Sequence, residues 1–254
     1  MKNPVTLCYK QINDLSLYMD LYTPDSDHPA PVVMWIHGGA WLEGDRSSPM
    51  LAWIVNHGFA LASIDYRLSK DGPFPNHIID CKDALVYLKD IARQYHCDPK
   101  RIAVAGDSAG GHLAALMGTS IGHADWEVPG ADCSVKAVID FYGPTDSTRD
   151  WPNARLPDSP ESQLLGANVT SKAGRAKAAI ASPLTYIDGS EPPFLIFHGD
   201  ADDIVPFSQS LYLRDALEEA GVPVSMQRIW DGGHGFAMEP LKPTILHFLI
   251  RTLC

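Results

Sequence analysis

The feature that most constrains this chain is a run of very small residues between an expected strand and an expected helix. Residues 101–105 have β-type character, and Gly106, Ser108 and Gly110 follow them in the pattern G-x-S-x-G. A run of small and apolar residues typical of a helix begins at Gly111. A serine on so tight a turn has a strained backbone, so its neighbours two positions away must carry almost no side chain. The pattern predicts a strand–turn–helix element that exposes the Ser108 hydroxyl at the edge of a sheet.

Length, composition and charge restrict the class of protein. A chain of 254 residues can bury a large core, and we expect a single domain over residues 1–254. Hydrophobic residues make up 45% and charged residues 20% of the chain, which is ordinary globular usage. The net charge of −11 argues against nucleic acid or an anionic membrane as partner. We therefore expect a small-molecule substrate as the partner, and a monomer or homodimer as the assembly.

The cysteines and the first residues bear on the cellular compartment. The five cysteines are scattered and contain no C-x-x-C pair, so we expect neither a disulfide framework nor a zinc site. No apolar run follows the first four residues, and no apolar stretch approaches the roughly 20 residues that cross a bilayer. The expected location is the reducing cytoplasm, with most thiols buried and free. We expect no metal and no cofactor.

Apolar periodicity predicts strands and helices that alternate along most of the chain. Two alternating runs, at residues 6–10 and 15–22, predict an antiparallel strand pair at the N-terminus. Later strands are expected at residues 31–37, 59–66, 101–105, 135–142, 194–198 and 224–230, and helices at 48–57, 77–95, 206–220 and 240–253, besides the helix that begins at 111. This order predicts an α/β fold with a mostly parallel central sheet and helices on both faces.

One segment does not follow this alternation. Residues 143–183 contain no clear strand and are rich in Pro, Asp, Ser and Asn. The segment follows an expected strand at the carboxyl edge of the sheet, where open α/β folds bind their ligands. We expect it to form a small lid or cap over the site, and a surface excursion without function is the alternative.

A nucleophilic serine needs a base to take its proton and an acid to orient that base. In this architecture the acid comes next along the chain and the histidine last. His234 lies in a glycine-rich loop after the last expected strand, so it is the candidate base. Three carboxylates follow the preceding strand; Asp202 is the favoured acid, Asp203 the second choice and Asp200 the third. His198, at the end of that strand, is expected to be structural.

Acyl transfer also needs hydrogen-bond donors for the oxyanion of the tetrahedral intermediate, each worth roughly 3 kcal/mol in serine hydrolases. Ala109, the residue after the nucleophile, offers one backbone amide. The loop after an early strand offers others at Gly38, Gly39 and Ala40, where glycine lets the backbone approach a substrate closely. Candidate substrate-binding residues near these loops are Trp41, Asp107, Phe141, Tyr142 and Trp151, the last of which is alternatively a core residue of the lid.

With these residues in place, the chain resembles the α/β-hydrolase superfamily, in particular the esterase/lipase group related to hormone-sensitive lipase. The likeness runs from Val32 to about His247. Three motifs carry it: His-Gly-Gly-Ala-Trp at 37–41, Gly-Asp-Ser-Ala-Gly-Gly at 106–111, and His-Gly-Asp-Ala-Asp at 198–202 with Val-Pro at 205–206. The resemblance implies that Asp202 is the acid and that the amides of Gly39, Ala40 and Ala109 form the oxyanion hole.

The chain looks most like small esterases that deacylate carbohydrates or aromatic esters, including acetyl and feruloyl esterases. Lipase-type members often have a third glycine in the oxyanion loop and a helical cap before it, and this chain has neither. The resemblance therefore implies a metal-free serine carboxylesterase that acts on short-chain acyl or aromatic esters, possibly of carbohydrates, through an acyl-enzyme intermediate.

Three alternatives remain open. Kynurenine formamidases share the His-Gly-Gly-x-Trp motif, so an aryl formamide is a second candidate substrate. Peptidases of the prolyl-oligopeptidase type share the motif around Asp202, but this chain has no room for their propeller domain. A non-catalytic ligand-binding protein on a hydrolase scaffold is the alternative from another class, although such proteins commonly lose the nucleophile or the base.

Overall fold

An eight-stranded sheet forms the centre of the computed structural model, which describes residues 3–123, 125–149 and 156–254. The strands are β1 (Val5–Ile12), β2 (Leu15–Tyr22), β3 (Ala30–Ile36), β4 (Ala60–Ile64), β5 (Cys97–Asp107), β6 (Val138–Phe141), β7 (Phe194–Gly199) and β8 (Val224–Ile229). They lie in the order β1-β2-β4-β3-β5-β6-β7-β8. β1 and β2 are antiparallel, as are β2 and β4, and every other neighbouring pair is parallel. The predicted mostly parallel sheet with an antiparallel N-terminal pair is confirmed.

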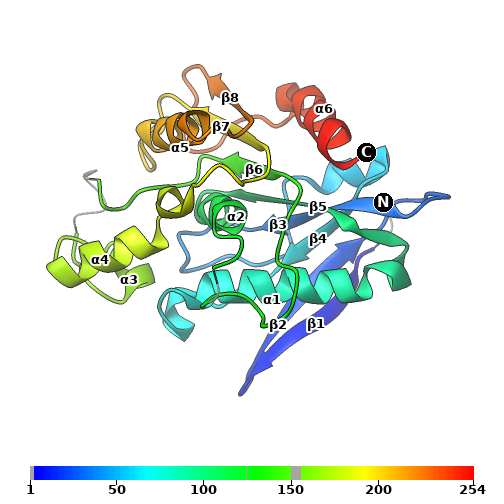
Figure 1. Ribbon diagram of the computed structural model, residues 1–254, viewed down its shortest axis with the longest axis horizontal. Helices are drawn as coiled ribbons and strands as arrows, with labels where there is room; N and C mark the ends of the chain where they lie inside the picture. Colours follow the sequence, from blue (N-terminus) through cyan, green and yellow to red (C-terminus); the bar gives the residue numbers. More distant parts are fainter. Residues whose placement is uncertain (1–2, 124, 150–155) are drawn as a thin grey trace.

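The helices lie on both faces of this sheet, as predicted (Figure 1). The α-helices are α1 (Asn76–Ile91), α2 (Ala109–Thr119), α3 (Pro160–Leu165), α4 (Lys172–Ala181), α5 (Ser208–Glu219) and α6 (Lys242–Leu253). Short 3₁₀ helices are η1 (Ala52–His57), η2 (Ser69–Asp71), η3 (Ala92–Tyr95), η5 (Pro183–Tyr186) and η6 (Glu239–Leu241). The helix expected at 48–57 is only the 3₁₀ turn η1. The helix expected at 77–95 narrows into η3 and ends at His96, whose left-handed backbone stops it.

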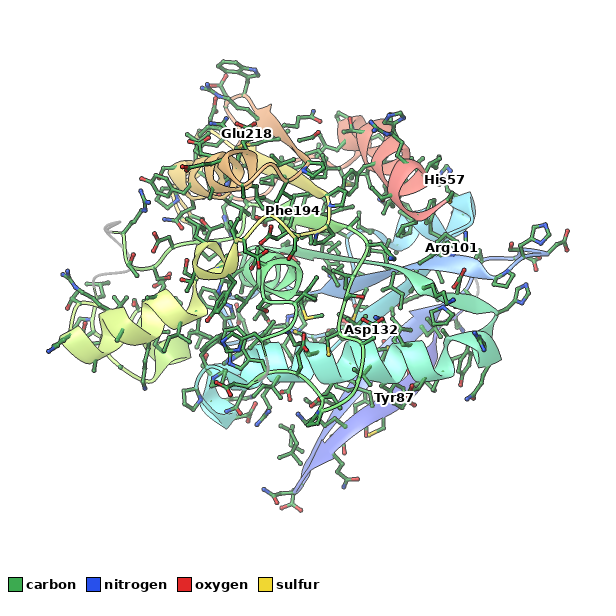
Figure 2. The ribbon with its side chains drawn as sticks, viewed as in Figure 1. His57, Tyr87, Arg101, Asp132, Phe194 and Glu218 are labelled. Atoms are coloured by element: carbon green, nitrogen blue, oxygen red, sulfur yellow. The ribbon has the colours of Figure 1, made fainter. Side chains whose placement is uncertain are left out.

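Two apolar clusters separate the sheet from these helices. α1, α2 and α5 cover one face, and η1 and α6 cover the other. All seven residues of β3 are buried, as expected for an interior parallel strand that is covered on both faces. Phe194 of β7 lies close to α2, and its ring fills the space where a side chain at Gly118 would stand (Figure 2). The core therefore fixes β5, β6 and β7 side by side, with their carboxyl ends at one edge.

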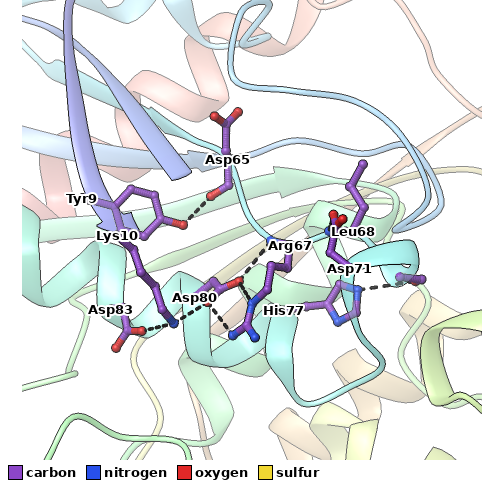
Figure 3. Close-up of polar contacts among 10 residues, drawn as sticks. Tyr9, Lys10, Asp65, Arg67, Leu68, Asp71, His77, Asp80 and Asp83 are labelled. Atoms are coloured by element: carbon purple, nitrogen blue, oxygen red, sulfur yellow. Dashed lines mark hydrogen bonds and ion pairs between the residues drawn. The ribbon is translucent and has the colours of Figure 1, made fainter. Parts of the chain in front are cut away.

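A buried carboxylate ties the N-terminal hairpin and the end of β4 to α1 (Figure 3). The Asp80 side chain is fully buried, and Arg67 Nε and Nη2 donate to its two oxygens at 2.7 and 2.8 Å. Lys10 of β1 binds the same carboxylate at 2.5 Å and also contacts Asp83. A buried charge is stable only when it is paired and hydrogen-bonded in this way. The network fixes the segment after β4, which lies next to the loop after β3.

The segment 143–183 contains α3 and α4, which lie together at one end of the molecule (Figure 1). Serines cap both helices: Ser159 Oγ accepts from the amide of Ser162, and Ser171 Oγ accepts from that of Gly174. No strand occurs in the described part of the segment, in agreement with the sequence. Its role as a lid stays a prediction.

The five cysteines are free; Cys81, Cys97 and Cys133 are buried, and Cys8 and Cys254 are exposed.

Candidate active site

Ser108 stands on a sharp turn between β5 and α2, at the carboxyl edge of the sheet. Its backbone has φ 52° and ψ −118°, a strained conformation for a residue with a side chain. The amide of Ser108 donates to the carbonyl of Phe141 at 2.8 Å, which fastens the turn to β6. The first helical residue is Ala109, so the N-terminus of α2 faces the same space as the serine.

The glycines on either side of Ser108 are required by close packing. A Cβ atom at Gly106 would lie 2.3 Å from the carbonyl oxygen of Gly110. A Cβ atom at Gly110 would lie only 2.0 Å from the carbonyl oxygen of Ile36, at the end of β3. Both separations are far below van der Waals contact, so no larger residue fits. The G-x-S-x-G pattern thus marks a place where three backbone segments meet.

The structure brings Ser108, His234 and Asp202 together from three distant parts of the chain. His234 Nε2 lies 2.9 Å from Ser108 Oγ, and His234 Nδ1 lies 2.8 Å from Asp202 Oδ2. A carboxylate can only accept, so Nδ1 carries the proton and Nε2 is free to accept the serine proton. This arrangement has the hydrogen-bond order of a nucleophile, a general base and an orienting acid.

Asp202 receives donors on both carboxylate oxygens. The amides of Ile204 and Val205 donate to Oδ1 at 2.9 Å each. Oδ2 faces His234 at 2.8 Å and His198 Nε2 at 3.2 Å. Burial alone would raise the pKa of Asp202, but the hydrogen bonds from His198, His234 and the two amides lower this pKa well below its ordinary value. These hydrogen bonds therefore favour the ionised form of the Asp202 carboxylate.

His198 contacts the same oxygen of Asp202 as His234 does. Its ring is fully buried, and Nε2 faces two acceptors, the carbonyl of Val205 at 2.9 Å and the Asp202 carboxylate. Nε2 therefore carries the proton, and Nδ1 accepts from Ser210 Oγ at 2.7 Å. His198 has no contact with Ser108, so its placement agrees with the structural role expected of it.

The other two carboxylates at this strand end face elsewhere. Asp200 accepts from Arg228 Nε at 2.5 Å and from the amide of Asp231 at 2.7 Å, and so binds the end of β8. Asp203 is exposed. His234 contacts Asp202 and neither of these alternatives. The geometry thus favours the first of the three expected acids.

The loop after β3 lies beside the turn that carries Ser108, but the backbone amide of Gly38 is not free to donate to a substrate. Its amide donates to Asp107 Oδ1 at 2.9 Å, which corrects the expectation that Gly38 contributes to an oxyanion hole. Burial raises the pKa of Asp107, while the bond from Gly38 opposes that rise. Asp107 was expected to contact substrate; in the structure its carboxylate instead ties the loop to the turn that holds the serine.

The next three residues of this loop all have left-handed backbones. Their φ values are 109° at Gly39, 54° at Ala40 and 59° at Trp41. The carbonyl of Gly39 accepts from the amides of Leu42 and Glu43 at 2.9 and 3.1 Å, which closes the loop into a tight turn. Within the described residues, the amides of Gly39, Ala40 and Ala109 have no backbone or side-chain acceptor. These three amides are therefore available as donors beside the Ser108 turn.

Replacement of Gly39 by alanine is expected to lower kcat for a short ester by about 10²-fold, the effect of one misplaced oxyanion donor. The reason is steric: a Cβ atom at Gly39 would lie 2.2 Å from the carbonyl oxygen of Glu43 and push the loop out of place. Gly58→Ala is the matched control, because Gly58 also has a positive φ of 86° but no atom lies within 4 Å of its Cβ position. The control should lose stability without losing kcat; equal kcat for both variants would contradict this role of the loop.

Several residues expected to contact substrate are buried. Phe141 is fully buried and packs on Trp35 and Phe197, with ring centroids 6.0 and 5.1 Å apart, so it belongs to the core. Trp41 is only 2% exposed and packs edge-on against His112. Both expectations are corrected, because these two side chains are buried against other aromatic rings and leave almost no surface for a substrate. Trp151 lies outside the described residues.

Tyr142 is also nearly buried, but it touches the candidate base. Its ring lies edge-on to His234 at 4.8 Å and to Phe236 at 5.3 Å. Its φ of 46° is unusual for a tyrosine and turns the chain sharply after β6. No sequence pattern predicts this contact, since Tyr142 and His234 are 92 positions apart. Tyr142 restricts the imidazole of His234 rather than forming an open pocket wall.

Neither a metal centre nor a membrane span is found in the described part of the chain. No group of three or more His, Cys, Asp or Glu side chains there could hold a metal ion. The helices of residues 3–123, 125–149 and 156–254 are too short or too polar to cross a membrane.

Comparisons with known proteins find relatives of this chain in both sequence and structure. The BD-FAE family model matches residues 19–217. The chain is 33% identical over 219 residues to a probable carboxylic ester hydrolase, LipM, of Mycobacterium tuberculosis; the match covers 83% of this chain and 50% of that protein. A truncated carbohydrate esterase from gut microbiota has a TM-score of 0.86 and 27% identity, with 99% of both chains covered. A bifunctional GH43-CE protein of Bacteroides eggerthii has a TM-score of 0.85 and 31% identity over 98% of this chain and 38% of that one.

The chain spans about half the length of the curated relatives that it matches. The family match nevertheless includes the β3 loop, the Ser108 turn and the Asp202 loop, and the structural match includes the whole sheet. The predicted resemblance to α/β-hydrolase esterases is confirmed at the level of family and fold. The chain belongs to the BD-FAE family, and its fold is that of the α/β-hydrolases.

Proposed function

We propose that this chain hydrolyses carboxylic esters with Ser108 as nucleophile, His234 as general base and Asp202 as orienting acid. One observation carries the proposal: two hydrogen bonds, of 2.9 and 2.8 Å, join the serine hydroxyl to the imidazole and the imidazole to an ionised carboxylate. A serine is weakly nucleophilic unless a base accepts its proton as it attacks. A histidine between a strained serine and a carboxylate has the geometry of a base that is oriented toward its nucleophile.

The acylation step follows from the donors and acceptors of the site. Ser108 Oγ attacks the ester carbonyl carbon while its proton moves to His234 Nε2. The carbonyl oxygen gains the negative charge and accepts from the amides of Gly39, Ala40 and Ala109. His234 then gives the proton to the alkoxide oxygen as the carbon–oxygen bond breaks. The alcohol leaves, and the acyl group remains on Ser108.

Deacylation repeats these steps with water. His234 Nε2 removes a proton from the water, whose oxygen attacks the acyl carbon. The same three amides hold the second oxyanion. His234 returns the proton to Ser108 Oγ as the acid leaves. Throughout both steps Asp202 holds Nδ1 protonated and stabilises the imidazolium that forms.

The substrate class we infer is a short acyl ester, acetyl or an aromatic acyl such as feruloyl, on a carbohydrate alcohol. Two similar structures are named as a carbohydrate esterase and as a GH43-CE protein, and the first matches this chain over its full length. The partner is then a small-molecule or oligosaccharide ester, which is consistent with a net charge of −11 that disfavours polyanions.

A substrate panel tests this proposal. The purified chain is assayed with p-nitrophenyl acetate and butyrate, an acetylated xylo-oligosaccharide, methyl ferulate and N-formylkynurenine. We expect turnover of the acetyl esters and slower turnover of the formamide. A kcat/KM for N-formylkynurenine above that of every ester would assign the chain to aryl formamide hydrolysis instead. Failure to hydrolyse any of them, with no labelling by a fluorophosphonate, would indicate a binding protein.

A further inference from the structure

Trp230 is the most exposed large apolar side chain of the described residues. It is 73% exposed and lies directly after β8, four residues before His234. An indole left open to water contributes little to folding, because it buries almost no apolar surface. Its place on the loop that carries the candidate base therefore calls for another explanation.

The turn that carries Trp230 is rigidly held. The amide of Gly232 donates to the carbonyl of Ile229 at 3.1 Å, and Asp231 has a left-handed φ of 54°, as in a tight turn. Asp200 Oδ1 accepts from the Asp231 amide at 2.7 Å. The carbonyl of Gly232 accepts from the amide of Ala201 at 2.9 Å, so the turn sits on the segment that leads to Asp202.

A cation fixes one face of the indole. The guanidinium carbon of Arg228 lies 3.7 Å from the Trp230 ring centroid and 5.5 Å from that of Phe207. Asp200 Oδ2 accepts from Arg228 Nε at 2.5 Å and keeps the guanidinium in place. Because one face is covered and the residue is still 73% exposed, the other face of the indole is open to solvent.

The proposed mechanism gives the direction in which the alcohol leaves. His234 must reach the alkoxide oxygen to protonate it, so the alcohol part of the ester lies on the His234 side of Ser108. In the sheet, β3 lies on one side of β5, and β7 and β8 lie on the other, so the β3 loop with its oxyanion amides is on the opposite side of Ser108 from the loops of Asp202 and His234. A sugar alcohol longer than one ring therefore extends over the loops that carry Asp202 and His234, toward Trp230.

We propose that Trp230, backed by Arg228, is a stacking platform for a sugar ring of an oligosaccharide substrate, beyond the ring that bears the acyl group. This inference rests on the proposed ester hydrolysis and adds a specificity-determining residue to it. The open indole face packs against the apolar C–H face of the pyranose, while Arg228 on the opposite face holds the indole in place. Rigid mounting lowers the entropy lost when the ring binds.

The test compares a mono-acetylated xylose with a mono-acetylated xylotetraose as substrates of Trp230→Ala. We expect the ratio of kcat/KM for the tetraose to kcat/KM for the monosaccharide to fall roughly three- to tenfold, mainly through KM. Trp230→Phe should recover part of the ratio, because it keeps an aromatic face. Ile250→Ala is the control, because this side chain is likewise exposed, to 53%. It lies in α6, far from the site: the end of this helix contacts Arg101, near the amino end of β5.

The outcomes separate the two proposals. An unchanged ratio in Trp230→Ala would overturn the platform and leave ester hydrolysis intact. An equal loss on both substrates would also overturn it, since it would mean that the substitution disturbs the His234 loop. No hydrolysis of either ester or of p-nitrophenyl acetate by the unmodified chain would instead refute the proposed function on which the platform rests.

Discussion

Ser108→Ala is expected to lower kcat for p-nitrophenyl acetate by about 10⁴-fold or more and to leave KM within a few fold. The substitution removes the oxygen that carries the acyl group in the proposed mechanism, whereas the three proposed oxyanion amides remain. Ser108 Oγ makes one side-chain hydrogen bond among the described residues, to His234. The strained turn is held by glycine packing and by the Ser108 amide, so the fold should persist.

Ser225→Ala is the matched control for this variant. Ser225 is an exposed serine in β8, away from the carboxyl edge where Ser108 lies. Its variant should keep full kcat and full labelling by a fluorophosphonate probe, whereas Ser108→Ala should lose both. Circular dichroism and the melting temperature check that both variants are folded. Labelling of Ser108→Ala to the same extent as the unmodified chain would reject Ser108 as nucleophile.

The parts of the site that could be predicted from sequence are those fixed by local backbone constraints and chain order. Gly106 and Gly110 stand where three backbone segments meet, and that crowding is visible in the sequence as a pair of glycines. Asp202 and His234 follow strands whose apolar runs are clear, so parallel packing had to bring their loops to one edge.

The parts that could not be predicted depend on where a side chain or an amide points. Gly38 looks like an oxyanion donor in the sequence, but its amide is taken by Asp107, a residue 69 positions away. Phe141 and Trp41 are aromatic residues near site loops, and only the packed structure shows that they belong to the core. Trp230 is the reverse case, because it ends the strand expected at 224–230 and yet its side chain is 73% exposed.

Asp202→Asn is expected to lower kcat by about 10³- to 10⁴-fold because it reverses the tautomer of His234. The amides of Ile204 and Val205 donate to Oδ1, so the asparagine carbonyl must take that position. Its NH₂ group then faces His234 Nδ1 in place of Oδ2 and forces Nδ1 to accept. Nε2 becomes protonated and can no longer take the proton of Ser108. The same NH₂ group meets the Nε2–H of His198, so the variant should also be less stable.

Asp203→Asn is the matched control, because it removes one exposed negative charge from the adjacent residue and should leave kcat within about twofold.

The pH dependence of stability adds a second readout for Asp202→Asn. The folded-state pKa of Asp202 is lowered by its hydrogen bonds, so its contribution to the unfolding free energy is complete above the ordinary pKa of 3.8 and is lost as pH falls further. The stability gap between the unmodified chain and Asp202→Asn should therefore narrow below about pH 4, measured by urea unfolding. A gap that is constant with pH, or a kcat loss shared by Asp203→Asn, would show that the carboxylate at 202 does not hold His234 as its geometry indicates.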